Sequence, residues 1–159
     1  MLTIDEEAGQ DTIYAALIQN LQPYFCCMID ATTLRLGNFI LHKGGVRILP
    51  VTIGLQHFEL LAKGMAKDMF PIKLSAENLK KCGFIENVKY YQHPEVKEYI
   101  LTLPVKGENN NEIRGYVPAT TPFARATFNE HMISNNIYHL HELQNLYYAL
   151  TGTELEVKM

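Results

Sequence analysis

The stretch Tyr138-His-Leu-His-Glu-Leu-Gln-Asn-Leu-Tyr-Tyr-Ala-Leu-Thr-Gly152 decides the fold, because it carries the strongest helical signal in the chain. Successive residues of a helix turn by about 100°. Large apolar residues then collect on one side, namely Leu140, Leu143, Leu146, Tyr147 and Leu150. This stripe is wide enough to face a core. Gly152 predicts the end of the helix, because glycine adopts the left-handed C′ conformation without steric cost.

The opposite side of this predicted helix is polar but almost uncharged. Between Tyr138 and Gly152 the only formally charged residue is Glu142, whereas a solvated helix face normally carries Lys, Arg and Glu. Uncharged polar side chains cost less to remove from water than charged ones. We therefore predict a binding or interface surface, covered by another element, a second subunit or a ligand. Its residues are His141, Glu142, Gln144, Asn145 and Tyr148. The alternative is a structural face that bonds backbone groups of an adjoining sheet.

The composition favours one globular domain without a strong attraction for polyanions. A chain of 159 residues is long enough to bury a substantial core. Its net charge of -3 and pI of about 6.1 give no global attraction for nucleic acid or anionic membranes. The 14 Lys and Arg residues are scattered, so charge does not support nucleic-acid binding, although a small site remains compatible with it.

The sequence favours a cytoplasmic protein. It contains no apolar run near the roughly 20 residues that a membrane-spanning helix needs. Its N-terminus is acidic where a signal peptide would be basic. The three cysteines, Cys26, Cys27 and Cys82, are an odd number and read as reduced thiols. We predict no membrane partner and no cofactor.

The remaining segments predict an α+β fold, because helices and strands do not alternate strictly. We expect one domain with an antiparallel sheet, an N-terminal helix, one or two central helices and the C-terminal amphipathic helix. Predicted helices cover residues 3–21, 55–64 and 76–82, and predicted strands cover residues 34–41, 46–53, 84–91, 99–105, 112–117 and 123–128.

Three local signals fix parts of this outline. Gly44-Gly45 supplies the positive φ angles that a tight hairpin turn needs. Pro50 cannot donate a ladder hydrogen bond, so its strand is predicted at a sheet edge. Ser75 is a good N-cap for the short helix that follows, and Gly83 ends that helix.

Three pieces of the chain resemble a family of short uncharacterised proteins from Bacteroidetes genomes and their prophages. These pieces are Leu34-Arg-Leu-Gly-Asn38, the segment 71–84 and the segment 141–155. Asn78 stands where the family has a tryptophan. The resemblance covers Met28 to Leu155 in outline and implies a prophage context without catalytic residues. It also implies a single α+β domain over residues 28–159, with residues 1–27 either as an added N-terminal helical extension or as upstream sequence from a misassigned start codon.

His139-x-His141-Glu142 is the sharpest candidate for metal chemistry. Two imidazoles and a carboxylate could bind a divalent metal ion. Side chains two residues apart on a helix, however, diverge by about 200°. His139 and His141 can therefore bind the same metal ion only if the helix begins after His139. The alternative places His139 at the helix start and bonds His141 to a neighbouring loop. We favour this alternative and predict no metal site.

The sequence predicts no complete catalytic set. Cys26-Cys27 lies in an apolar run, and Ser75 lacks the Gly-x-Ser-x-Gly elbow of a nucleophile. The leading hypothesis is a non-enzymatic, prophage-associated protein that acts through protein–protein interaction, with a homodimer or an unidentified protein as its partner. The alternatives are a small nucleic-acid-associated module of phage replication or regulation, and a metal-dependent hydrolase that uses His139, His141 and Glu142.

Overall fold

Two antiparallel sheets, each with its own hydrophobic cluster, form the framework of the chain. The structure is a computed structural model that describes residues 29–87, 96–104, 111–118, 121–128 and 131–158. The predicted helix over residues 3–21 and the predicted extension over 1–27 lie outside the described residues. The α+β class is confirmed, but the strands form two sheets where the sequence predicted one.

The first sheet has three strands in the order β2-β1-β3. Its strands are β1 (Phe39–Gly44), β2 (Arg47–Thr52) and β3 (Met69–Phe70), and the helices around it are η2 (Ala31–Thr33), α2 (Leu55–Ala62) and η3 (Ala66–Asp68). Ile29, Ile40, Ile53 and Met69 form its buried cluster. α2 begins at Leu55 as predicted and ends before Gly64, whose φ of 73 closes the turn.

The hairpin of this sheet turns one residue later than predicted. Gly44 pairs with Arg47 at the end of β1, so the two turn residues are Gly45 and Val46. Gly45 has a φ of 66, a left-handed value that favours glycine. The predicted Gly44-Gly45 turn is therefore wrong by one residue. Pro50 lies on β2, an edge strand of the sheet, as predicted.

The second sheet has five strands in the order β4-β5-β6-β7-β8. Its strands are β4 (Ile85–Glu86), β5 (Lys97–Thr102), β6 (Glu112–Val117), β7 (Phe123–Phe128) and β8 (His131–Met132). The predicted bounds of β6 and β7 are confirmed. α3 (Ala76–Lys81) precedes this sheet, and the Ser75 hydroxyl caps it by accepting the Asn78 N–H at 3.1 Å.

The two faces of the five-stranded sheet differ in character, because side chains alternate along each strand. The inner face carries the buried residues Tyr99, Ile113, Ala124 and Ala126, which pack with Leu79 of α3 and with Leu140 and Leu143 of the C-terminal helix. Gly115 lets α3 approach closely, since a Cβ there would lie 2.7 Å from Leu79 Cδ1. The outer face carries the alternate residues of the same strands, among them Arg114 and Arg125.

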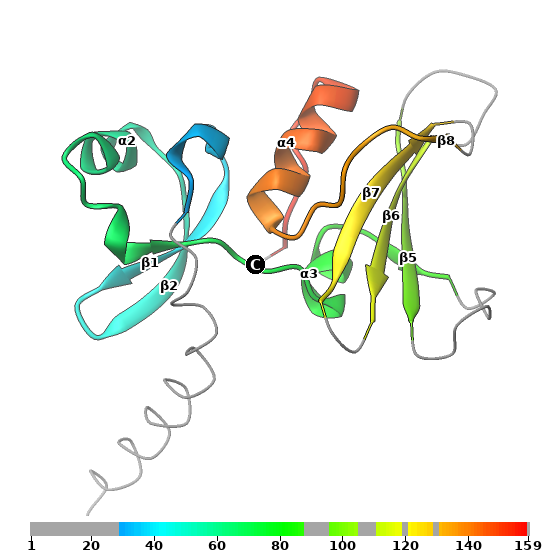
Figure 1. Cartoon of the computed structure of the whole chain (residues 1–159), viewed down its shortest axis with the longest axis horizontal. Helices are drawn as coiled ribbons and strands as arrows, with labels where there is room; N and C mark the ends of the chain where they lie inside the picture. The colour runs from blue at the N-terminus through cyan, green and yellow to red at the C-terminus, as the bar shows by residue number, and fades with distance from the viewer. Residues whose placement is uncertain (1–28, 88–95, 105–110, 119–120, 129–130, 159) are drawn as a thin grey trace, which may run out of the picture.

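α4 (Leu140–Thr151) lies between the two sheets (Figure 1). The extended segments before α4 and α3 pair with each other: the Leu74 N–H donates to Tyr138 O at 2.9 Å, and the Leu140 N–H donates to Ile72 O at 2.8 Å. Gly152 ends α4 with a φ of 71, as predicted. The predicted leucine stripe is confirmed, because Leu140 and Leu143 are fully buried.

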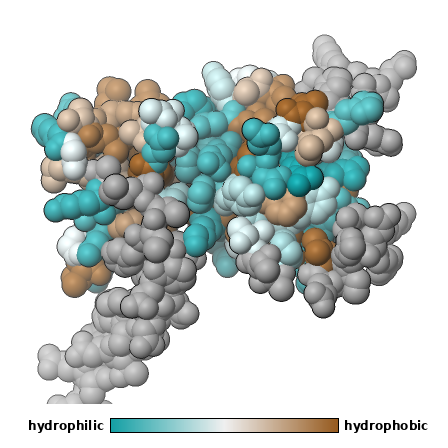
Figure 2. All heavy atoms as spheres, in the orientation of Figure 1, coloured by the Kyte–Doolittle hydropathy of each residue, from teal (hydrophilic) through white to brown (hydrophobic). Residues whose placement is uncertain are grey.

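The surface is uneven in hydropathy. Hydrophobic residues gather over α2 (Figure 2), where Leu55 is 70% exposed. Within the described residues, no helix has the length and apolar character needed to cross a membrane.

Candidate functional site

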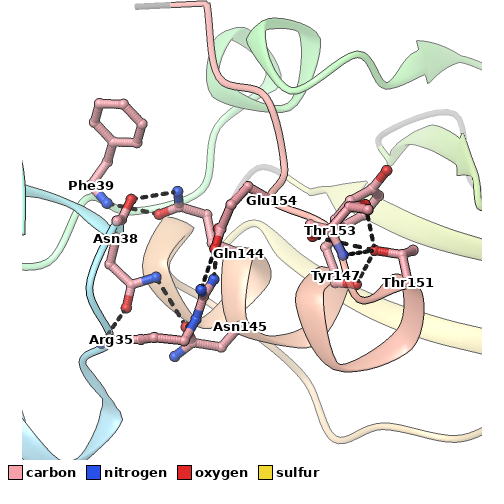
Figure 3. A network of polar contacts seen from close by, with 10 residues as sticks. Arg35, Asn38, Phe39, Gln144, Asn145, Tyr147, Thr151, Thr153 and Glu154 are labelled. Atoms are coloured by element: carbon pink, nitrogen blue, oxygen red, sulfur yellow. Dashed lines mark hydrogen bonds and ion pairs between the residues drawn. The ribbon is translucent and has the colours of Figure 1, made fainter.

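Gln144 joins α4 to the first sheet. Its side chain is 1% exposed. Its Oε1 accepts the Phe39 N–H at 2.8 Å, and its Nε2 donates to Gly37 O at 3.4 Å (Figure 3). Phe39 opens β1, so Gln144 satisfies the backbone at the point where the three-stranded sheet begins. The amide of Gln144 thus has both a donor and an acceptor partner inside the chain.

Asn145 extends this contact along the helix. Its Oδ1 accepts from Asn38 Nδ2 at 3.0 Å and from Arg35 Nε at 3.1 Å. Its Nδ2 donates to Thr33 O at 2.6 Å. Asn38 is itself fully buried and accepts the Arg35 N–H through Oδ1 at 2.7 Å. The segment 33–39 and α4 therefore share one continuous set of hydrogen bonds (Figure 3).

His141 is 2% exposed and bonds the same segment. The Thr33 hydroxyl donates to Asp30 O at 2.7 Å, so it accepts from His141 Nε2 across the 3.1 Å that separates them. This pairing requires a hydrogen on Nε2. Burial lowers the pKa of the imidazole to about 4, against the smaller opposing effect of Glu142. His141 Nδ1 is buried and has no hydrogen-bond partner among the described residues.

Glu142 closes the N-terminus of α4. Its Oε2 accepts the backbone N–H of His139 at 3.1 Å and of Tyr138 at 3.2 Å, and lies 3.3 Å from His139 Nδ1. The bond from His139 is the main cause that lowers the pKa of Glu142 to about 2. A carboxylate at this position also complements the helix dipole. Glu142 therefore acts as a helix cap in this structure.

The helix begins after His139, so the divergence expected on a helix does not apply to the two histidines. The rings of His139 and His141 stack at 5.7 Å with 15° between their planes. In the part of the chain that the structure describes, no group of three or more His, Cys, Asp or Glu side chains is placed to hold a metal ion. The pair thus lacks the ligand number that zinc sites have.

Tyr148 is the exposed member of the predicted surface, at 43%. The Arg35 guanidinium lies 4.3 Å from its ring centroid and donates to Glu154 Oε2 at 2.9 Å. Of the predicted surface, His141, Gln144 and Asn145 contact the segment 33–39 of the same chain. The covering element of this face is therefore internal.

A second polar surface lies on the outer face of the five-stranded sheet. Arg114 on β6 and Arg125 on β7 are direct cross-strand partners. Like charges in this position repel each other unless something neutralises them. Arg114 is neutralised by Glu112, whose carboxylate lies 3.0 Å from it, and by the buried Glu98, at 3.5 Å.

Arg125 has no such carboxylate among the described residues. Its Nε donates to Asn136 Oδ1, and its guanidinium lies 4.9 Å from the Phe123 ring centroid. Within the described part of the chain, its two terminal nitrogens have no hydrogen-bond acceptor. A guanidinium has five N–H donors. Arg125 therefore keeps most of its hydrogen-bonding capacity open.

Two open hollows meet at Arg125. One, of about 340 Å³, is lined by Arg114, Tyr116, Arg125, Thr127 and Met132. The other, of about 400 Å³, is lined by Arg125, Met132, Ser134, Asn135, Asn136 and Tyr138. They share Arg125 and Met132, and none of the described residues that line them is a carboxylate. We call the two together the Arg125 groove.

Aromatic rings form one side of this groove. Phe123 stacks on Tyr116 with centroids 5.1 Å apart and meets the Tyr138 ring edge-on at 6.5 Å. Tyr138 is 40% exposed and Met132 is 59% exposed. No local sequence pattern points to Arg125. Aligning the predicted strands 112–117 and 123–128 end to end would have placed Arg125 opposite Gly115, whereas the observed register is shifted by one residue and places it opposite Arg114.

The nucleophiles singled out in the sequence, where the structure describes them, have structural surroundings. Cys82 is buried, and burial raises the pKa of its thiol to about 12, so it is protonated at neutral pH. The Ser75 hydroxyl is engaged as a helix cap. Cys26 and Cys27 lie outside the described residues.

We find no match for the chain among models of protein families, among curated proteins or among solved structures. Function is therefore inferred from the two polar surfaces themselves. The face of α4 is occupied by the chain, whereas the Arg125 groove is open.

Proposed function

We propose that this chain is a non-enzymatic protein that acts through protein–protein interaction, and that the Arg125 groove is its docking surface. The observation that carries the proposal is the open guanidinium of Arg125 inside a hollow that also exposes Met132 and Tyr138. Arg, Tyr and Met are enriched at protein interfaces. Rigid aromatic and arginine side chains also supply most of the binding energy there.

The prophage context remains a proposal that rests on the sequence resemblance. A homodimer, proposed from the uncharged face of α4, is one form that the partner could take. A homodimer through this groove would bring a second Arg125 toward the first across a two-fold axis. Like charges would then meet unless a carboxylate intervened. A different protein fits the groove better than a second copy.

A nucleic-acid-associated module is the second candidate, and one observation favours it. Two arginines and the rings of Tyr116, Phe123 and Tyr138 lie on one sheet face, as in surfaces that stack bases of single strands. Arg114, however, is paired with two carboxylates. One open arginine gives little of the phosphate neutralisation on which such binding depends.

Site-specific photo-cross-linking tests the proposed function. In one variant a photoreactive residue replaces Met132 in the groove. In a second variant it replaces Val46 in the hairpin turn between β1 and β2. Val46 is the matched control, because it is 93% exposed and lies in the hairpin turn of the first sheet. Illumination of cells that express the full chain is expected to give a defined protein adduct from position 132 only.

The same adduct should be lost when Arg125→Glu is combined with the photoreactive residue at position 132. Equal adducts from positions 132 and 46 would mean that the groove has no special role. A mass equal to twice that of the chain would identify a homodimer in place of a different partner.

A further inference from the structure

Arg35 has the same kinds of contact as Arg125 and, in addition, a carboxylate partner within the chain. Arg35 lies 4.3 Å from the Tyr148 ring centroid, bonds an asparagine amide through Nε and holds Glu154 with its terminal nitrogens. Arg125 repeats the first two contacts with Phe123 and Asn136. The contact that differs is the carboxylate, which the described residues supply to Arg35 and not to Arg125.

From this we propose that the Arg125 groove binds an extended segment of a partner protein through one Asp or Glu side chain flanked by an apolar side chain. The inference rests on the proposed function and names the chemistry of its partner. The partner's carboxylate takes the place at Arg125 that Glu154 takes at Arg35. Arginine and carboxylate form two parallel hydrogen bonds, which fix the orientation of the bound group.

The charge of the groove selects an anion. Among the described residues its lining contains Arg114 and Arg125 and no carboxylate, although the chain as a whole carries a net charge of -3. Ser134, Asn135 and Asn136 add neutral hydrogen-bonding groups to the second hollow. A single acid in this hollow therefore meets a cation and neutral polar groups.

The same surroundings disfavour a polyanion. Glu98 and Glu112 accompany Arg114 on the outer face and neutralise it. A nucleic acid presents a phosphate at every nucleotide and binds where several cations follow its backbone. Within the described part of the chain the groove offers one arginine without a carboxylate partner, which matches one carboxylate of a ligand.

The shape of the groove favours an extended segment. The hollow beside Arg114 lies on the sheet face, and the hollow beside Tyr138 lies along the segment that follows β8. A chain that runs through both passes Arg125 and Met132, which the hollows share. Met132 and Tyr138 are exposed there and would pack on an apolar side chain next to the acid.

Selection from a library of short random peptides displayed on phage tests the inference. The full chain is the target, and peptides that survive on Arg125→Glu are removed. The retained peptides are expected to share one Asp or Glu beside an aliphatic or aromatic residue. A synthetic peptide of that consensus should bind Arg125→Glu at least about tenfold more weakly than the parent chain, because the charge-assisted bonds are lost.

Three further measurements decide the result. Arg47→Glu makes the same charge change at an exposed residue of β2, and should bind the peptide like the parent chain. Arg125→Lys keeps the charge but loses the paired donors, and is expected to give intermediate affinity. The peptide with Gln in place of its acid should lose binding to the parent chain. If the peptide with phosphoserine in that place binds as tightly as the acidic peptide, the groove recognises any anion that offers two oxygens.

The inference is wrong if the selection enriches no peptides, or enriches peptides without an acid. It is also wrong if Arg125→Glu and Arg47→Glu bind alike, or if a single-stranded oligonucleotide binds more tightly than the peptide in a salt-dependent way. Circular dichroism of each variant shows whether a loss of binding reflects a loss of fold. A cross-link from position 132 without an acidic consensus would leave the proposed function in place and remove only this inference.

Discussion

Arg35 and Arg125 have nearly the same contacts with a ring and an asparagine. They differ in whether a carboxylate of the described residues pairs with the guanidinium. Each guanidinium lies close to an aromatic ring, at 4.3 Å from Tyr148 for Arg35 and 4.9 Å from Phe123 for Arg125. Each bonds an asparagine through Nε. Arg35 also holds Glu154, so its region is closed, whereas the described residues leave the terminal nitrogens of Arg125 without a carboxylate.

The same contrast separates the two polar surfaces as a whole. On α4, the side-chain amides of Gln144 and Asn145 form hydrogen bonds with the segment 33–39. Such a surface stabilises the fold, because a buried polar group that loses its partner is costly. In the Arg125 groove the described residues leave the terminal nitrogens of a half-buried arginine without an acceptor, beside the exposed Met132 and Tyr138, and a binding surface needs such open groups. The contrast makes four predictions, from the largest effect to the smallest.

Acidification should weaken the closed region through His141. Its pKa is about 4 in the folded chain and near the ordinary 6.5 when unfolded. Between these values the unfolded chain binds more protons, so the free energy of unfolding falls as the pH falls. The loss should reach about 3 kcal/mol at pH 4 and change little below it. Urea unfolding across this pH range measures it.

The variant His141→Gln should flatten this pH dependence, because glutamine does not titrate. His131→Gln is the matched control, since His131 is exposed on β8. If the unfolding free energy of His141→Gln falls with pH as steeply as that of the parent chain, other groups cause the pH dependence and the prediction for His141 is wrong.

Gln144→Ala should cost about 2 kcal/mol, because it leaves the partly buried Phe39 N–H without its acceptor and removes the bond to Gly37 O. Chemical denaturation at neutral pH measures this loss. Gln56→Ala, at an exposed position of α2, should change the unfolding free energy by less than about 0.5 kcal/mol. Equal costs at the two positions would mean that the face of α4 is not a stabilising contact.

The sequence predicts those parts of the fold that depend on neighbouring residues. Ser75 caps α3, Gly152 ends α4, and β6 and β7 have the predicted bounds. The hairpin turn was displaced, because Gly44 and Gly45 both tolerate turn geometry and only strand pairing decides between them. The division into two sheets was not predicted, because β3, which belongs to the first sheet, has only two residues and pairs with β1 across α2, so it leaves no periodic pattern.

The candidate site was predictable only in part, for a similar reason. The uncharged face of α4 indicated that something covers Gln144 and Asn145. Their partners lie more than a hundred positions earlier in the chain, and no local pattern encodes such a contact. Arg125 depends on the pairing of β6 with β7 and on Asn136, which reaches it from outside the strand.

Arg35→Gln should cost about 1 kcal/mol. It removes the ion pair with Glu154, which is exposed and contributes little, and the bond to Asn145, which is part of the contact with α4. Thermal unfolding of this variant measures the loss, with Glu154→Gln as the control that removes the ion pair alone. If the two variants lose the same stability, the contact of Arg35 with Asn145 adds nothing.

Arg125→Gln should leave the stability within about 0.5 kcal/mol of the parent chain, although it makes the same substitution at a residue with the same ring and amide contacts. The physical reason is that Arg35 bonds Asn145 of α4, whereas Arg125 bonds Asn136 outside α4, and among the described residues no carboxylate loses its partner when the Arg125 guanidinium is removed. Thermal unfolding of the parent, Arg35→Gln and Arg125→Gln under one condition measures the difference directly. A loss at Arg125 as large as that at Arg35 would make Arg125 a structural residue, and the distinction between a closed and an open arginine would fail.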